Sequence, residues 1–194
     1  MKLIDTKLDG VKIIEPKVFK DNRGFFMESF NFKKFEELRL KFDFIQDNHS
    51  LSVDKDVIRG LHYQLNPNAQ TKLVRVITGS IYDVAVDIRQ GSPTFGQWMG
   101  VKLSEDNHRM LVVPKGFAHG FCTLQENTHV QYKVDDYYSA ENDKGILWND
   151  PALAIDWPTS NPILSEKDAK QPLLNDAEIN FLYQTKEGVD HGVL

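Results

Sequence analysis

Short runs in which apolar residues occupy every second position, separated by turn residues, fill the middle of this chain. Within residues 83–89, Val84, Val86 and Ile88 follow this rule. A period of two predicts a β-strand with one buried face, because successive side chains of a strand point to opposite sides. Residues 130–134 repeat the pattern. Many such runs and few helical segments predict an all-β fold, a β-sandwich or barrel with a few short helices.

Turn residues indicate how some of these strands connect. The tripeptide at 78–80 contains Gly79 and separates the strand-like runs 73–77 and 81–88, so it predicts a β-hairpin turn. Pro114 follows the run 111–113 and is expected to end that strand, because proline cannot donate a ladder hydrogen bond.

Two segments are predicted to be helical. Asn31 is a favourable N-cap, and apolar residues follow it at helical spacing as far as Leu38. A second short helix is predicted to begin at Ser165, because residues 165–168 resemble a capping box.

The length of 194 residues suits one domain. We expect residues 1–174 to form this domain. Residues 175–194 are expected to be a loosely attached C-terminal tail, packed on the domain or extending from it, with Phe181 and its neighbours as packing contacts.

Composition excludes several classes of partner. A formal net charge of −5 argues against a nucleic-acid surface. No apolar run approaches the length of a membrane span, so we expect no membrane partner. The single cysteine, Cys122, lies in a strand-like run and is expected to be a buried, unreactive thiol. A lone free cysteine fits the reducing cytoplasm, where we expect this protein to be located.

The residue types in the run 58–65 suggest chemistry. Strict alternation would place His62 on one face of the strand and Arg59 on the opposite face together with Leu61 and Tyr63. On two other runs, alternation gives Lys72 the same face as its apolar neighbours, and the same holds for Tyr132.

If these faces line the interior of a barrel, His62, Lys72 and Tyr132 converge on one cavity. An imidazole, a cation and a phenol are the set needed to remove a proton next to a carbonyl and to return one from the other side. Each residue also has a structural alternative: a packed strand histidine, a surface lysine and a core aromatic.

A set of short motifs occurs in order along residues 1–174. The motifs are residues 21–29, 46–50, 59–64, 92–96, 114–121, 137–139, 149–152 and 164–168. Each is weakly specific alone, but together and in this order they closely resemble the dTDP-4-dehydrorhamnose 3,5-epimerase family. The resemblance implies a cupin-like jelly roll, a homodimer without a cofactor, and the third step of dTDP-L-rhamnose synthesis.

The resemblance also implies roles for the catalytic candidates. His62 resembles the base that removes the C5 and then the C3 proton of a 4-keto sugar, and Asp168 resembles its acidic partner. Asp168 could instead cap the predicted helix. Tyr132 resembles the acid on the opposite face of the sugar, and Lys72 resembles the residue that stabilises the enolate oxygen.

Further residues resemble the contacts of the family with its nucleotide-sugar substrate. Arginine forks suit diphosphate oxygens, Glu28 resembles a thymine contact, and Tyr138 is a candidate to stack on the base. The region 23–28 is expected to reach the site of a neighbouring subunit. The expected substrate-binding residues are Arg23, Phe26, Glu28, Gln46, Asn48, Arg59, His119, Tyr138, Asp143 and Lys167.

Three alternative functions stay open on the sequence. Many cupins bind a metal through a His-x-His pair, a Glu and a later His, but here Gln64 replaces the second histidine while His119 remains. We therefore expect no metal, since one His and one Gln beside a lysine are a poor ligand set. The alternatives are an epimerase that acts at one carbon only, a non-catalytic sugar-nucleotide-binding cupin, and a metal-dependent cupin.

Overall fold

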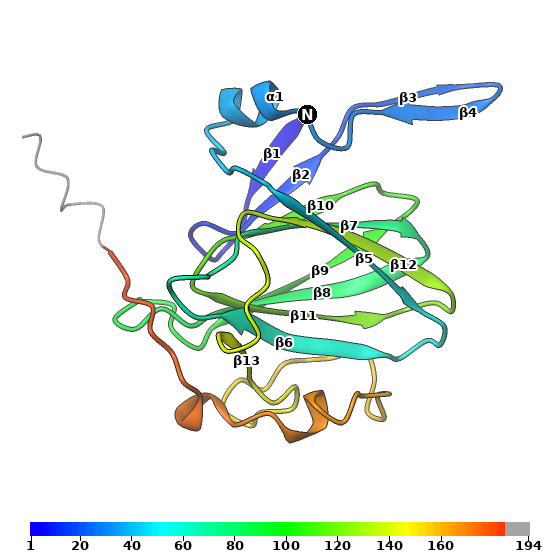
Figure 1. The fold of residues 1–194 in the computed structure, drawn as a ribbon. Helices are drawn as coiled ribbons and strands as arrows, with labels where there is room; N and C mark the ends of the chain where they lie inside the picture. The colour runs from blue at the N-terminus through cyan, green and yellow to red at the C-terminus, as the bar shows by residue number, and fades with distance from the viewer. Residues whose placement is uncertain (185–194) are drawn as a thin grey trace, which may run out of the picture.

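Strands are the main regular element of the computed structural model, which describes residues 1–184 (Figure 1). The strands are β1 (Lys2–Asp5), β2 (Lys12–Glu15), β3 (Val18–Asp21), β4 (Gly24–Met27), β5 (Gln46–Ser52), β6 (Ile58–Gln64), β7 (Lys72–Thr78), β8 (Ser80–Asp87), β9 (Trp98–Ser104), β10 (Met110–Val113), β11 (Phe117–Thr123), β12 (Thr128–Val134) and β13 (Asp143–Gly145). The helical elements are α1 (Phe32–Glu37) and the single 3-10 turns η1 (Asp168–Lys170) and η2 (Leu174–Asp176).

The strands form two large sheets and one small one. The six-stranded sheet has the order β1-β2-β10-β7-β12-β5, and the five-stranded sheet has the order β13-β6-β11-β8-β9. The hairpin of β3 and β4 extends away from both large sheets (Figure 1). The expected all-β, jelly-roll β-sandwich is confirmed.

The two large sheets pack face to face over an apolar core. The six-stranded sheet contributes Val74 and Val130, among others, and the five-stranded sheet contributes Ile81, Ala85 and Phe121. Burial of this shared face is the main favourable contribution that holds the sandwich together.

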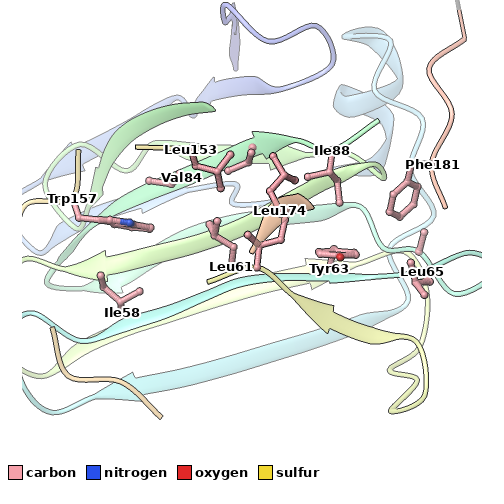
Figure 2. Close-up of a cluster of buried hydrophobic side chains, with 14 of the residues drawn as sticks. Ile58, Leu61, Tyr63, Leu65, Val84, Ile88, Leu153, Trp157, Leu174 and Phe181 are labelled. Carbon is pink, nitrogen blue, oxygen red and sulfur yellow. The ribbon is translucent and has the colours of Figure 1, made fainter. Parts of the chain in front are cut away.

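A second core covers the outer face of the five-stranded sheet. Leu61 and Tyr63 of β6 pack there against Trp157, Leu174 and Phe181, which the C-terminal third of the chain supplies (Figure 2). The five-stranded sheet is therefore buried on both faces, whereas the sequence pattern predicted one buried face for residues 83–89. That prediction is wrong, because Asp83 and Asp87 are fully buried. The Asp83 carboxylate is hydrogen-bonded to His119, and the Asp87 carboxylate accepts a hydrogen bond from Arg89.

The short helix α1 covers part of the outer face of the six-stranded sheet. Asn31 caps it as predicted, since its side-chain oxygen accepts a hydrogen bond from the Lys34 N–H at 3.2 Å. Phe35 is buried against Ile14 and Met110 of the sheet. No helix among residues 1–184 is long and apolar enough to cross a membrane.

The predicted hairpin at residues 78–80 is wrong. β7 pairs with β10 and β12 in one sheet, while β8 pairs with β9 and β11 in the other. Gly79 carries the chain from one sheet to the other with φ of 83°, and a Cβ there would lie 2.4 Å from Thr128 Oγ1. A glycine between two strands marks a tight corner in both cases, so the sequence does not distinguish a hairpin from a sheet crossing.

The predicted helix at Ser165 is shorter than expected. Ser165 Oγ accepts a hydrogen bond from the Asp168 N–H at 3.0 Å, as in a capping box, but only the 3-10 turn η1 follows. Gln171 is already extended, because the residue before Pro172 is disfavoured in the helical region. The polypeptide therefore makes one tight turn that directs Asp168 inward.

Residues 175–184 are more firmly attached than the sequence suggested. Gln90 exchanges backbone hydrogen bonds with Phe181 and Tyr183, at 2.8 Å and 2.9 Å. Tyr63 Oη donates to the Glu178 carbonyl at 2.8 Å. The remainder of the predicted tail, 185–194, lies outside the described residues.

β6 contains one extra residue relative to its neighbour β11. His62 lies opposite His119, but Arg59 lies opposite Phe121, so three steps along β6 match two along β11. Gly60 occupies this bulge with φ of 122°. The bulge shifts the alternation of side chains by one, so the predicted separation of Arg59 and His62 onto opposite faces is wrong.

Only glycine fits at the bulge. A Cβ on Gly60 would lie 2.6 Å from Gly120 Cα and 2.7 Å from the His119 carbonyl oxygen, both of them backbone atoms of β11. Backbone atoms cannot move aside without opening the sheet. The close approach of β6 and β11 therefore depends on the absence of a side chain at this position.

We predict that Gly60→Ala lowers the free energy of unfolding by more than ~3 kcal/mol, because it adds a backbone clash to an unfavourable φ. Gly24→Ala is the matched control: Gly24 has φ of 132°, but nothing lies within 4 Å of a Cβ there. The control should lose only about 1–2 kcal/mol. Urea unfolding measures both, and equal losses would contradict a role for the close approach.

Candidate active site

A cavity of about 280 Å³ lies between the two large sheets. It takes side chains from both sheets and from the turn that precedes η1. The lining residues are Ser50, Arg59, His62, Lys72, His119, Phe121, Tyr132, Ser165, Lys167 and Asp168.

The two sheets supply opposite walls of this cavity. Arg59 and His62 come from β6 of the five-stranded sheet, with both side chains on the cavity side because of the bulge at Gly60. Lys72 and Tyr132 come from β7 and β12 of the six-stranded sheet. A flat molecule between the sheets would have an imidazole on one side and a phenol on the other.

His62 forms a short hydrogen bond with a buried carboxylate. Its Nε2 lies 2.6 Å from Asp168 Oδ1. Burial would raise the pKa of Asp168, but hydrogen bonds to His62 and Ser165 and one from the Gly60 N–H lower it more, so the net pKa is below its usual value. Because a carboxylate can only accept hydrogen bonds, Nε2 must carry the ring proton and donate the hydrogen bond to Asp168. This leaves Nδ1 as the unprotonated, basic ring nitrogen.

A second histidine–carboxylate pair lies beside the first. His119 is opposite His62 in the strand register, and its Nε2 is 2.5 Å from Asp83 Oδ1. Asp83 lies on β8, two strands from His62, and is fully buried. As a carboxylate, Asp83 fixes the orientation of the His119 ring in the same way.

Lys72 lies on the opposite wall of the cavity from His62. Its Nζ donates to the His62 carbonyl oxygen at 3.5 Å. Burial lowers the pKa of Lys72 to about 8, and the negative charges of Asp143 and Asp83 oppose this shift. With a pKa of about 8, the amine is still mostly protonated at neutral pH. The buried ammonium group can therefore stabilise negative charge in a site with little water.

Tyr132 lies on the wall opposite His62 and is partly buried. Burial raises the pKa of its phenol, the positive charge of Arg59 partly offsets this rise, and the charge of Asp143 adds to it. The phenol thus keeps its proton at neutral pH and is available to donate it.

Asp143 connects two other expected substrate contacts, of which Lys167 lines the cavity. It accepts hydrogen bonds from Lys167 Nζ at 2.5 Å and from Tyr138 Oη at 3.1 Å. The charge of Asp143 raises the pKa of Tyr138, whose ring is largely exposed. An exposed ring beside a cavity is a suitable platform for a stacked base.

Gln46 and Asn48 lie on β5, the edge strand of the six-stranded sheet. Asn48 is directly opposite Tyr132 in the register and so shares its face, and Gln46 Nε2 donates to Asn48 Oδ1 at 2.9 Å. Both amides therefore face the same side of the sheet as the cavity and lie on its edge.

Three expected substrate contacts lie elsewhere in the chain. Arg23 and Phe26 are on the projecting hairpin, with the Arg23 side chain 85% exposed and Phe26 67% exposed. Arg23 forms an ion pair with Asp21 at 2.6 Å, and Glu28 pairs with Lys34. None of the three lines the cavity of its own chain.

Sequence reasoning missed four residues of the site. Ser50 and Phe121 line the cavity and lie within motifs that predict no role for them, and Ser165, predicted only to begin a helix, lines it too. The Ser50 hydroxyl is buried and has no hydrogen-bond partner among the described residues. Alternation in the run 83–89 predicts an exposed face for Asp83, and only its pairing with His119 in the structure reveals its place.

Gln64, which occupies the position of a cupin metal ligand, is engaged elsewhere. Its Nε2 donates to the carbonyls of Asn68 and Tyr137, and its Oε1 accepts from the Ser139 N–H at 2.8 Å. These bonds fix the segment that carries Tyr138. Among residues 1–184, no group of three or more His, Cys, Asp or Glu side chains is arranged to hold a metal ion.

Comparison with known proteins gives a consistent result. The family model described as dTDP-4-dehydrorhamnose 3,5-epimerase matches residues 5–176. The protein of that name from Salmonella typhimurium is 56% identical over 179 residues, which covers 91% of this chain and 97% of the relative.

Two solved structures are also similar. The dTDP-4-dehydrorhamnose 3,5-epimerase from Bacillus anthracis, with TDP and PPi bound, is 59% identical with a TM-score of 0.87 and covers 89% of this chain and 98% of its own. The dTDP-6-deoxy-D-glucose-3,5-epimerase from Legionella pneumophila, in complex with dTDP-4-keto-L-rhamnose, is 51% identical with a TM-score of 0.91. That match covers 95% of this chain and 99% of the other.

Proposed function

The chain belongs to the dTDP-4-dehydrorhamnose 3,5-epimerase family, and from this membership we propose that it converts dTDP-4-dehydro-6-deoxy-D-glucose to dTDP-4-dehydro-L-rhamnose. The protein is an isomerase of dTDP-L-rhamnose biosynthesis that inverts C3 and C5. The observation that carries the proposal is the placement of His62 and Tyr132 on opposite walls of one cavity. Inversion at a carbon next to a carbonyl requires a base on one face and an acid on the other.

His62 is the base. Its Nδ1 takes the proton from C5, which is acidic because the C4 carbonyl is adjacent. The electron pair of the broken C–H bond moves into an enolate, and the charge comes to the C4 oxygen. Asp168, bonded to the other ring nitrogen at 2.6 Å, holds the ring and stabilises the imidazolium that forms.

Lys72 stabilises the enolate oxygen through its ammonium charge. A donor of this kind, preorganised in a water-poor site, contributes on the order of 3–4 kcal/mol to the transition state.

Tyr132 then donates its phenolic proton to C5 from the opposite face, which inverts the centre. Solvent returns a proton to Tyr132 and takes the one on His62. The same steps repeat at C3. Every step is a proton transfer, so the proposal includes no cofactor.

The nucleotide is held at the mouth of the cavity. Arg59 and His119 suit the diphosphate oxygens, and Gln46 and Asn48 lie on the neighbouring edge strand. Lys167 and Asp143 border the same opening. The exposed ring of Tyr138 offers a surface on which thymine can stack.

The projecting hairpin supports a homodimer. Phe19, Phe25 and Phe26 are all more than half exposed on this two-stranded element, which is unusual for a monomer surface. In a symmetric dimer, the hairpin of each subunit would reach the site of the other and supply Arg23, Phe26 and Glu28. This placement would account for the distance of these three residues from their own cavity.

A cytoplasmic location is part of the proposal. It is supported by Cys122, which is a free and fully buried thiol whose pKa burial raises to about 12. Such a thiol suits a reducing compartment.

The central test is proton NMR of the proposed substrate in deuterated water, with and without EDTA. We predict deuterium at both C3 and C5 with wild-type protein, unaffected by EDTA. His62→Ala should abolish exchange while dTDP still binds, and Tyr132→Phe should slow inversion about 10²–10⁴-fold while some exchange persists. Exchange at one carbon would indicate a single-site epimerase. No exchange at either would leave a binding protein, and loss with EDTA would indicate a metal-dependent cupin.

A pH profile tests Lys72. The ammonium is needed, and its pKa is lowered to about 8, so kcat/KM should fall as pH rises through this value. Tyr132, whose pKa is raised, keeps its proton there and contributes no fall in this range. In Lys72→Arg the guanidinium stays charged, so residual activity should persist to higher pH. A limb near pH 8 that survives unchanged in Lys72→Arg would contradict the assignment.

Mixed dimers test the shared site. His62→Ala and Arg23→Ala homodimers should each be nearly inactive. When the two variants are co-expressed, each mixed dimer should contain one intact site, and random mixing restores about one quarter of wild-type activity. If each hairpin served its own chain, mixing would restore nothing.

A further inference from the structure

Asp83 interrupts an apolar row in the centre of the molecule. On β8 it lies between Ile81 and Ala85, both of which belong to the core between the two sheets. Its partner His119 similarly lies between Phe117 and Phe121 on β11. An ionisable pair thus occupies two positions whose neighbours on the same face of each strand are apolar.

Such a pair is a costly way to join two strands. Removing a carboxylate from water costs several kcal/mol, and a packed apolar pair of similar volume is often as stable or more so. The matched pair on the same strand, Asp87 with Arg89, has both carboxylate oxygens fully bonded. Asp83 differs, because its Oδ2 is buried and has no hydrogen-bond partner among the described residues. Structural stabilisation alone does not explain that unpaired oxygen.

The negative charge of Asp83 acts on the cavity. It is one of the two carboxylates whose charges oppose the lowering of the Lys72 pKa by burial. The other, Asp143, is already paired with Lys167 at 2.5 Å. Asp83 is therefore a buried carboxylate near Lys72 whose one ion-pair partner in the described part of the chain is His119, and whose Oδ2 stays unpaired.

We propose that Asp83 is a positioning residue of this site, whose Oδ1 orients the His119 ring in the cavity wall and whose buried negative charge acts on the Lys72 ammonium group. The inference rests on the proposed function, since both groups act on the substrate. Asp83 itself touches no substrate atom and acts through His119 and Lys72.

Other charged and titratable groups also surround Lys72. Asp143 and Asp168 are negative, and Arg59 and Lys167 are positive and oppose them. His62, His119 and Tyr132 complete the set, and the mechanism uses the first and third in neutral form before each turnover. Removal of Asp83 therefore turns an excess of one negative charge into a balance of two negative and two positive groups, around a lysine that burial already disfavours as a cation.

The test compares Asp83→Asn with Asp87→Asn, an equally buried carboxylate on the same strand that lies outside the cavity. The readout is the rate of C3 and C5 exchange in deuterated water across pH 6 to 10. We expect Asp83→Asn to lower kcat on the order of tenfold or more, since His119 loses its orientation. The alkaline limb should also move to lower pH by about one unit, because Lys72 loses a negative neighbour. Asp87→Asn should lower Tm and leave kcat and the limb unchanged.

Asp83→Glu separates charge from position. It retains the negative charge and displaces the carboxylate by one methylene, so kcat should fall while the alkaline limb stays near that of wild type. If Asp83→Asn does not fold, this variant decides: a limb shifted to lower pH, or an unchanged kcat, overturns the proposal. An Asp83→Asn protein that folds and keeps both the wild-type kcat and the wild-type alkaline limb also overturns the proposal. Absence of exchange in wild type would instead reject the proposed function itself.

Discussion

The backbone contact between Gly60 and Gly120 determines what the rest of the site can do. At this contact β6 contains one more residue than β11, and a Cβ on Gly60 would lie 2.6 Å from Gly120 Cα. The extra residue turns Arg59 to the same side as His62. Without it, the arginine would point into the apolar core on the outer face of the sheet, and the cavity would lose its cation on that wall.

The two sheets of the sandwich place the side chains of β6 opposite those of β7 and β12 across the cavity. Each large sheet contributes one wall, so the imidazole of His62 and the phenol of Tyr132 face each other across the space where a sugar ring would lie. The outer face of the five-stranded sheet is covered by the C-terminal third of the chain (Figure 2). The turn at Ser165 in this covering segment brings Asp168 to His62. The segment that completes the core therefore also completes the hydrogen-bonded pair of His62 and Asp168.

Much of this fold could be predicted from the sequence, and the misses have physical causes. Alternation located β12, the apolar run that ends at Pro114 located β10, and Asn31 located α1. Alternation failed at Gly60, since a bulge changes the period without changing composition. The turn prediction failed at Gly79, because a glycine at a tight corner suits either a hairpin or a crossing between sheets.

The candidate site, too, could be predicted only in part from the sequence. The convergence of His62, Lys72 and Tyr132 was predicted from strand faces, and all three line one cavity. Asp83 was not found, because a polar residue in an alternating strand looks solvent-facing until the cover over the sheet is known. The place of Arg23, Phe26 and Glu28 could not be derived either, because strand periodicity does not show that the hairpin of β3 and β4 projects away from the two large sheets.

A crystal structure of the protein with dTDP-D-glucose would test the account most directly, since this analogue lacks the C4 carbonyl and cannot react. The account predicts the hexose between the two sheets, with the C5 hydrogen directed at His62 Nδ1, roughly 3–3.5 Å between the reacting heavy atoms, and Tyr132 Oη on the opposite face of the ring. A sugar bound outside the cavity, or one with His62 and Tyr132 on the same face, would contradict it.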